Sequence, residues 1–290
     1  MNTGPTSRGT LLRRAFVEQF FLWLAILLVT AVVLYPFVWA LITSFKTIMD
    51  ALQPTIIPFV QFTPSIENWA AELGLGARET TKALTNSAVI AVGAMILATT
   101  LGTLTGYGLA RFRFRVGNRN LVSWFLSQRF LPPVATLIPF LLVLKFLNIL
   151  DTWLGLIIAN TTFTLPFAVL IMRDFFADFP DELEEAALVD GANAFQVFWR
   201  VALPIAGPAL AASAIICFAF AWNEYLFASV LTSRNAQPYT LLVASTGTSR
   251  GIHFGFVSTR MLIAVTLPVV LSLFVQRFVV RGLTLGAVKG

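Results

Sequence analysis

Two charged residues lie inside apolar runs of the chain. Arg129 and Glu224 occupy runs long enough to cross a membrane, where a central charge costs roughly 2.5–3.5 kcal/mol on insertion scales. Both are therefore expected to face protein or water, as residues of a solute pathway or of a structural lock. Pro132 and Pro133 follow Arg129 and lack a backbone donor, so they predict a kinked helix that can line a cavity.

Uncharged polar side chains accompany these charges. Asn160, Thr161 and Thr164 carry amide and hydroxyl groups that suit a solute with many hydroxyl groups, such as a sugar. Trp222 or Tyr225 could stack on the apolar face of a sugar ring. The alternative is that these polar groups only hydrogen-bond across helices, at about 0.6–2 kcal/mol each. The candidate pathway residues are Gln128, Arg129, Asn160, Thr161, Thr164, Trp222, Asn223, Glu224 and Tyr225.

The composition excludes several kinds of chemistry. His and Cys occur once each, so neither a His/Cys metal cluster nor an intrachain disulfide can form. An intramembrane enzyme would need a pair of buried aspartates or a serine with a histidine, yet no apolar run contains Asp and His253 lies outside these runs. The chain also has no G-x-x-x-x-G-K-[ST] phosphate loop, so it does not bind ATP by that device.

The overall composition predicts an all-α integral membrane protein. Of the 290 residues, 57% are hydrophobic and 12% are charged, against about 25% charged in soluble domains, and the mean hydropathy is +0.81. The net charge of +6 comes from basic residues spread between apolar runs, which does not predict nucleic-acid binding. A hydrocarbon core of about 30 Å needs roughly 20 apolar residues per helix. The six runs that qualify are Phe20–Thr43, Ser87–Leu109, Leu121–Leu147, Trp153–Met172, Ala206–Leu231 and Met261–Val280.

Basic residues near the ends of these runs predict the orientation of the chain. Arginines precede the first run, follow the second run and follow the sixth, which places both termini in the cytoplasm. The predicted organisation is then a cytoplasmic N-terminal segment (residues 1–19), a six-helix transmembrane domain (residues 20–280) and a cytoplasmic tail (residues 281–290). The transmembrane domain includes a cytoplasmic loop at residues 173–205.

That loop is strongly acidic, with seven carboxylates against two arginines over residues 173–200, which suits docking of a basic partner. Its centre is predicted to be a short amphipathic helix that begins at Pro180 or Asp181, because proline and carboxylates favour a first turn. Gly191 either ends this helix or lets another backbone approach closely. The alternative is a surface helix that lies along the membrane. The residues spaced to form one narrow apolar stripe, suited to a shallow groove, are Leu183, Ala186 and Ala187.

The spacing in this loop resembles the EAA signature of permease subunits of ATP-binding cassette importers. Glu185-Ala186-Ala187 is followed by Gly191 and then by Val201-Ala202-Leu203-Pro204, with Val201 where isoleucine is common. Other segments resemble the carbohydrate-uptake, maltose-type branch of that family, and together they cover nearly the whole chain. They are Phe62–Trp69, Arg129–Pro133, Leu165–Phe167, Trp222–Ala228 and Gly282–Gly290. The loop and the tail resemble those of the smaller, six-span maltose-type permease.

The resemblance implies a type I importer permease fold and a mechanism. In the family, the EAA helix is a coupling helix that sits in a groove of a cytoplasmic ATPase, whose closure moves the spans between inward-open and outward-open states. Glu185 would then pair with a basic ATPase residue, and Lys289 and Gly290 would contact the ATPase dimer interface. The implied coupling residues are Glu182, Glu185, Ala186, Ala187, Asp190, Gly191, Leu203 and Pro204.

The resemblance also implies partners. The chain would pair with a second permease subunit, while two ATPase subunits would bind ATP and Mg²⁺ and an extracytoplasmic binding protein would deliver a sugar, polyol or glycoside. The chain itself would hold no cofactor or metal and would lie among lipids of the bacterial inner membrane as a multi-pass protein. Gly102 and Gly106 form a small-xxx-small pair that predicts close helix packing, with the second permease as one candidate neighbour.

The alternative function is an ion-gradient-driven secondary transporter or channel. That class predicts an internal inverted repeat and repeated intramembrane carboxylates. Only Glu224 is centrally placed, and no convincing repeat is visible, so the importer permease is favoured.

Overall fold

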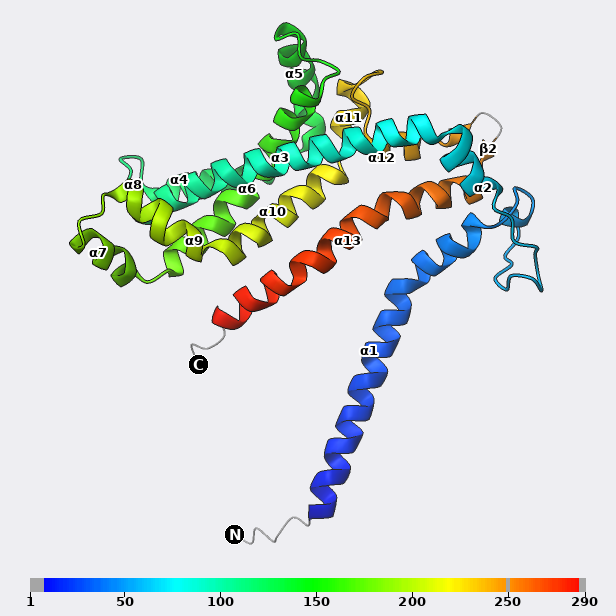
Figure 1. Ribbon diagram of the computed structural model, residues 1–290, viewed down its shortest axis with the longest axis horizontal. Helices are drawn as coiled ribbons and strands as arrows, with labels where there is room; N and C mark the ends of the chain where they lie inside the picture. The colour runs from blue at the N-terminus through cyan, green and yellow to red at the C-terminus, as the bar shows by residue number, and fades with distance from the viewer. Residues whose placement is uncertain (1–7, 249–250, 287–290) are drawn as a thin grey trace.

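The computed structural model describes residues 8–248 and 251–286, with side chains placed for residues 17–247 and 252–274. The described chain is predominantly helical (Figure 1). The longer helices are α1 (Arg8–Ser44), α3 (Ala77–Arg111), α4 (Asn118–Gln128), α5 (Pro133–Phe146), α6 (Trp153–Asp178), α7 (Asp181–Val189), α10 (Gly207–Trp222) and α13 (Phe254–Gly286). The short elements are η1 (Asp50–Leu52), α2 (Glu67–Ala70), η2 (Ala71–Leu75), α8 (Ala194–Val197), η3 (Phe198–Ala202), α9 (Leu203–Ile205), α11 (Leu226–Leu231), α12 (Tyr239–Ala244), β1 (Gly247–Thr248) and β2 (Gly251–Ile252).

Among the described residues, four helices are long and apolar enough to cross a membrane. They are residues 17–44 of α1, α3, α6 and residues 254–274 of α13. Two bent pairs qualify as further spans if each pair is counted as one, namely α4 with α5 and residues 194–205 with α10. The structure thus has four to six candidate spans, and it confirms the predicted all-α membrane fold.

The third predicted span is broken rather than gently kinked. Residues 129–132 separate α4 from α5, and the two helices meet at 92°. Pro132 has extended dihedral angles (φ −64°, ψ 122°), as expected for a residue that precedes another proline, and Pro133 begins α5. The predicted effect of the proline pair is confirmed, and it is larger than a kink.

The fifth predicted span, Ala206–Leu231, is not one helix, which corrects the sequence-based expectation. It consists of α10 and α11, separated by Asn223, Glu224 and Tyr225. The apolar run hides this break because the segments on both sides of it are apolar. α5 and α11 project from the same side of the bundle, beside each other (Figure 1).

α3, α6 and α10 form the packed centre of the bundle, where small residues allow close approach. Ala98 on α3 is fully buried. A Cβ at Gly102 would lie 2.4 Å from the Cβ of Ala168 on α6, and a Cβ at Gly106 would lie 2.7 Å from the backbone nitrogen of Arg173. The close neighbour of the glycine pair is therefore α6 of the same chain, and not a second permease.

α1 is attached to the rest of the chain differently from the other long helices. α1 projects away from the bundle, and the C-terminal end of α1 packs against α13 (Figure 1). Residues 17–38 are all exposed although they are strongly apolar. In a membrane protein, such a face contacts lipid or another subunit.

Polar contacts hold the connections at the end of the bundle opposite α7. The carboxylate of Asp151 accepts hydrogen bonds from the backbone N–H groups of residues 233–236 at 3.0–3.2 Å, which ties the α5–α6 connection to the α11–α12 connection. Nearby on α13, the Nε of Arg260 lies 2.9 Å from Oε2 of Glu72, whose side chain is fully buried. Asp151 thereby fixes the two connections to each other, and Arg260 fixes the segment before α3 to α13.

Candidate functional site

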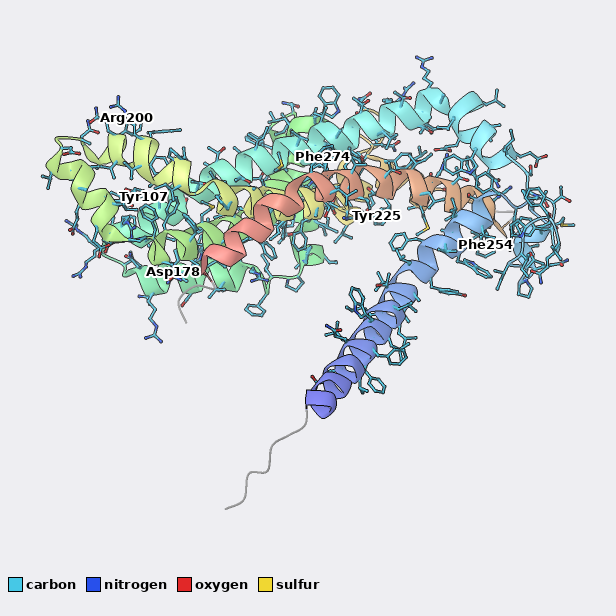
Figure 2. The ribbon with its side chains drawn as sticks, turned by 60° about the horizontal axis from the view of Figure 1, so that its bottom comes forward. Tyr107, Asp178, Arg200, Tyr225, Phe254 and Phe274 are labelled. Carbon is cyan, nitrogen blue, oxygen red and sulfur yellow. The ribbon has the colours of Figure 1, made fainter. Side chains whose placement is uncertain are left out.

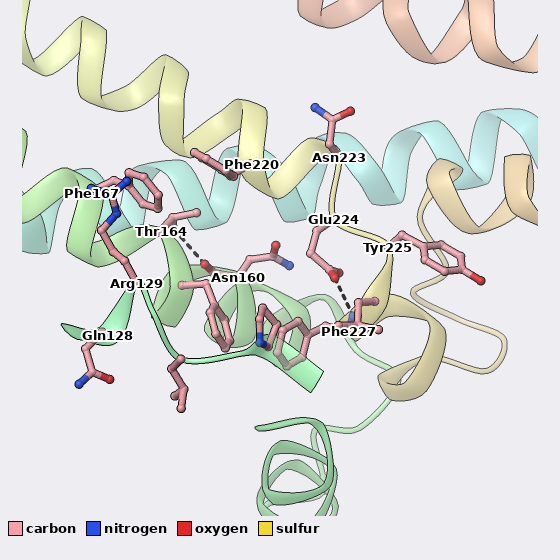
Figure 3. Close-up of a pocket in the computed structure, with 14 residues that line it drawn as sticks. Gln128, Arg129, Asn160, Thr164, Phe167, Phe220, Asn223, Glu224, Tyr225 and Phe227 are labelled. Carbon is pink, nitrogen blue, oxygen red and sulfur yellow. Dashed lines mark hydrogen bonds between the residues drawn. The ribbon is translucent and has the colours of Figure 1, made fainter. Parts of the chain in front are cut away.

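A cavity of about 500 Å³ opens where the two helix breaks face α6 (Figure 3). The α4–α5 break forms one side, α6 forms the back and the α10–α11 break forms the other side. The lining residues are Gln128, Arg129, Leu131, Pro133, Asn160, Phe163, Thr164, Phe167, Phe220, Asn223, Glu224, Tyr225, Leu226 and Phe227. Broken helices of this kind are tolerated at membrane depth only where their free backbone groups face protein or a cavity.

Most of the predicted pathway residues meet in this cavity. The seven that line it are Gln128, Arg129, Asn160, Thr164, Asn223, Glu224 and Tyr225. Asn160 and Thr164 share one face of α6 because they are four residues apart. Their common location is a feature of the structure, whereas their contact with a solute stays a prediction.

Two of the predicted residues lie elsewhere. Thr161 is rotated by about 100° from Asn160 around α6, and it lines a separate hollow between α3, α4 and α6. Trp222 is buried, and its indole Nε1 donates to the backbone oxygen of Ala264 on α13 at 3.0 Å. Its ring also stacks on Phe218, so Trp222 is part of the helix packing and does not face the cavity.

Glu224 forms an N-terminal cap for α11. Its Oε1 accepts from the backbone N–H of Phe227 at 2.6 Å (Figure 3). Its Oε2 accepts from the backbone N–H of Ala228 at 3.1 Å. The first N–H groups of a helix have no partner within the helix, and the helix dipole favours a negative charge there. The carboxylate is therefore occupied by the chain, which explains how a charge is accommodated in this apolar run.

Arg129 is held by an aromatic ring. Its guanidinium carbon lies 4.2 Å from the centroid of the Phe167 ring, a cation–π contact between the α4–α5 break and α6. The ion pairs of the described residues include none between Arg129 and Glu224. The two charges thus have separate partners although they line one cavity.

Five of the fourteen residues that line the cavity are aromatic, and of these the sequence reasoning placed only Tyr225 in the pathway. Phe163 and Phe167 follow Asn160 by three and seven residues and so share its face of α6, a spacing that could have identified them. Phe227 packs on Phe163 with ring centroids 4.8 Å apart. Aromatic walls with a few amide and hydroxyl groups suit an amphipathic ligand such as a polyol or sugar.

The acidic loop folds as predicted into a short helix, α7. It begins at Asp181, directly after Pro180, and ends at Val189. Gly191 has φ +88°, which favours glycine, and no other part of the described chain lies within 4 Å of where its Cβ would be. The N–H of Ala192 closes the end of the helix by donating to the oxygen of Ala187 at 3.0 Å.

The rest of the chain leaves most of the predicted apolar stripe of α7 uncovered, and the side of α7 that faces the bundle carries a carboxylate. Leu183 is 47% exposed and Ala186 is exposed, whereas the one buried side chain of α7 is Glu184. Glu182, Glu185 and Asp190 are exposed. Leu203 packs against the core under the loop, and Pro204 is exposed. The apolar residues of α7 are thus available to a partner rather than to the rest of the chain.

Glu184 belongs to a polar cluster that the sequence reasoning did not find. Its Oε1 lies 3.0 Å from Nε of Arg111, the last residue of α3, and its Oε2 accepts from the hydroxyl of Tyr107 at 3.1 Å. Arg111 also bonds Asp181 at 2.9 Å and donates to the backbone oxygen of Phe179 at 3.0 Å. The i, i+4 spacing of Tyr107 and Arg111 was the available signal.

This cluster and the loop lie at one end of the molecule. Tyr107, Asp178 and Arg200 are found there, and Phe254 marks the opposite end (Figure 2). The two predicted tail contacts, Lys289 and Gly290, lie outside the described residues. Within the part of the chain that the structure describes, there is no group of three or more His, Cys, Asp or Glu residues that could hold a metal ion.

A family model and individual relatives match this chain, and all of them are described as membrane components of transport systems. Residues 98–285 match the family described as "Binding-protein-dependent transport system inner membrane component". The inner membrane ABC transporter permease protein YcjP of Escherichia coli (strain K12) is 33% identical over 289 residues, 98% of this chain and 99% of that protein. The trehalose transport system permease protein SugB of Mycobacterium tuberculosis (strain CDC 1551 / Oshkosh) is 33% identical over 269 residues, 91% of this chain and 95% of that protein.

A solved structure shares the fold. One chain of a bacterial ABC transporter involved in the import of the acidic polysaccharide alginate superposes with a TM-score of 0.71 at 23% identity, over 95% of this chain and 99% of that chain. At this identity the likeness concerns the arrangement of helices and not the ligand.

Proposed function

The chain belongs to the family of binding-protein-dependent transport system inner membrane components, and on that premise we propose that it is the permease subunit of a carbohydrate importer driven by a separate ATPase. It is a multi-pass protein of the inner membrane, of the permease class rather than the ATP-hydrolysing class. The solute is a sugar, polyol or glycoside, which moves by alternating access. The observation that carries the proposal is α7, an acidic helix displayed at the end of the spans.

The exposed surface of α7 supports its role as the coupling helix. Leu188 and Val189 are 50% and 87% exposed, beside the exposed carboxylates of Glu182 and Glu185. An apolar patch with an acidic rim suits a groove that has a basic edge. The ATPase supplies that groove, binds ATP with Mg²⁺, and transmits its closure to the spans through α7.

The remaining partners follow from other surfaces. The apolar, exposed face of α1 leaves room for a second permease subunit, and the two permeases bind two ATPase subunits. An extracytoplasmic solute-binding protein meets the opposite end of the bundle, in keeping with the family description. The cavity at the two helix breaks is the proposed solute pathway, because it combines aromatic walls with amide and hydroxyl groups.

An ion-gradient-driven mechanism is less well supported. It would need a carboxylate free to bind an ion, but both oxygens of Glu224 already accept hydrogen bonds from α11. The relatives are also named as ABC transporter permeases.

The coupling assignment is tested with Glu185→Lys in the complete importer, using a cysteine at Ala187 to crosslink α7 to the ATPase in native vesicles. Glu79→Lys is the matched control, since Glu79 is also exposed but lies in the first turn of α3, at the opposite end of the molecule. We expect Glu185→Lys to weaken crosslinking and co-purification, with Glu79→Lys unchanged. Equal crosslinking in both variants, or solute transport by the purified chain alone, would overturn the proposal.

The pathway assignment is tested with Asn223→Ala. Asn120→Ala is the control, because both amides donate to the carbonyl four residues earlier at 2.8 Å while only Asn223 lines the cavity. We expect Asn223→Ala to change uptake without loss of assembly, and Asn120→Ala to behave as wild type. Loss of assembly in Asn223→Ala would favour a purely structural role.

A further inference from the structure

Three helix ends meet at the guanidinium group of Arg111. Arg111 is in the last turn of α3, Phe179 follows α6, and Asp181 begins α7. The guanidinium lies 3.0 Å from Glu184 Oε1, 2.9 Å from Asp181 Oδ1 and 3.0 Å from the oxygen of Phe179. The charges match the helix dipoles, because a cation is favoured at the C-terminal ends of α3 and α6 and carboxylates are favoured at the N-terminal end of α7.

Glu184 connects α7 to α3 at two points, one turn apart. Arg111 binds one oxygen, and the Tyr107 hydroxyl donates to the other at 3.1 Å. The Tyr107 ring packs against Phe176 of α6 and Phe198 of η3, with centroids 5.1 and 4.8 Å away. The Glu184 carboxylate is therefore joined to the aromatic core beneath the loop.

α7 has few other attachments to the spans. Glu184 is its one buried residue, and the chain reaches α7 through the extended residues Phe179 and Pro180. The Arg111 and Glu184 side chains are 13% and 11% exposed, so this ion pair is shielded from water. The Asp181 side chain is 73% exposed, and its pairing with Arg111 is weakened by solvent.

We propose that Arg111 and Glu184 are positioning residues that make α7 and α3 move as one body, so that a push on α7 is transmitted directly to the second span. Without the pair, α7 would pull on α6 through the short linker at Phe179–Pro180, and α3 would lag behind. α3 packs along both α6 and α10, which carry two sides of the cavity. The proposal rests on the coupling role of α7 and adds the residues that connect it to the spans.

The test uses the complete importer reconstituted in proteoliposomes, with ATP hydrolysed per solute molecule transported as the readout. Arg111→Gln removes the charge, and Arg113→Gln is the matched control because Arg113 is exposed and has no ion pair among the described residues. We expect Arg111→Gln to raise the ATP cost of transport by about 10-fold, a typical coupling effect, with Arg113→Gln unchanged. Crosslinking of Ala187→Cys to the ATPase should persist in both variants.

Two further variants keep the test decisive if Arg111→Gln assembles poorly. Tyr107→Phe keeps the ring packing and removes only the bond to Glu184, and we expect a smaller loss of coupling in the same direction. The loss of coupling in the double variant Arg111→Gln/Glu184→Gln should be smaller than the sum of the two single losses, because each single change already removes the ion pair that the two residues share. A wild-type ratio of ATP to solute in Arg111→Gln and Tyr107→Phe, with crosslinking intact, would overturn this inference alone. If Ala187→Cys in the otherwise wild-type chain does not crosslink to the ATPase either, the proposed function itself is overturned.

Discussion

The contact between α3 and α6 at Gly102 leaves no room for a methyl group. In Gly102→Ala, the new Cβ would lie 2.4 Å from the Cβ of Ala168, 2.8 Å from the Ala168 carbonyl carbon and 3.0 Å from the Val169 nitrogen. Ordinary contacts at such a carbon begin near 3.4 Å. Because two of the three atoms belong to the α6 backbone, they cannot turn aside as a flexible side chain would. The two helices must therefore separate by about 1 Å, which weakens the neighbouring contacts along the seam.

The size of the effect follows from two opposing contributions. Overpacking a tight interior costs about 1–3 kcal/mol, while alanine favours a helix over glycine by up to about 1 kcal/mol. We expect Gly102→Ala to lower the free energy of unfolding by about 1–2 kcal/mol, which corresponds to a melting temperature lower by about 2–8 °C. Gly108→Ala, on the same helix, is the control, since its Cβ would meet only the Cζ of Phe114 at 3.7 Å.

The assay is the fraction of protein that remains monodisperse after heating, measured by size-exclusion chromatography of the purified protein in lipid nanodiscs. Gly108→Ala should melt at or slightly above the wild-type temperature, because it gains helix propensity without a clash. Gly102→Ala should melt below both. If Gly102→Ala melted as high as Gly108→Ala, the tight α3–α6 seam would be refuted as an account of the glycine pair.

Three other perturbations test separate parts of the structure. Glu224→Ala removes the cap of α11, so the free energy of unfolding should fall by about 0.5–2 kcal/mol and solute uptake should fall as well. Glu224→Gln should give values between those of wild type and Glu224→Ala. Unchanged melting and uptake in Glu224→Ala would show that the cap is dispensable. Gly191→Val places a β-branched residue at φ +88°, so uptake should be lost while membrane insertion is retained, and normal uptake would remove Gly191 from the coupling loop. Burial by itself raises the pKa of Asp151, but hydrogen bonds from Asn235, Ala236 and Ser233 outweigh it and hold that pKa below its ordinary value. The Asp151 carboxylate therefore stabilises the fold above about pH 4, and this effect is lost as the pH falls through the lowered pKa. The melting temperature of wild type should exceed that of Asp151→Asn near neutral pH, and the two temperatures should become equal in acid. A difference in melting temperature that does not depend on pH would contradict this.

Local signals in the sequence were sufficient for the elements that depend on neighbours along the chain. Apolar runs of about 20 residues identified the four long spanning helices, since the thickness of a bilayer sets that length. Pro180 and Gly191 bounded α7 correctly, because proline and glycine act through their own backbone angles. Pro132 and Pro133 indicated a bend for the same reason, although the 92° angle was beyond what the sequence could give.

The direction in which each side chain faces could not be obtained in this way. Trp222 and Tyr225 are three residues apart in one apolar run, yet one packs on α13 and the other lines the cavity. The break between α10 and α11 turns the chain between them, and the segments on both sides of the break are apolar. Likewise, nothing in the sequence marks Glu184 as the side chain of α7 that turns inward, and its pairing with Arg111 decides that outcome.

The sequence by itself determined that this protein crosses the membrane several times, carries an acidic helix between two spans and places polar groups at membrane depth. The tertiary structure alone decided that seven of those polar residues share a cavity, that Gly102 contacts α6 and that Arg111 binds α7. The reason is that lipid is as apolar as a protein interior, so the faces of a spanning helix are not distinguished by hydrophobicity. Only packing against particular neighbours selects which face turns inward.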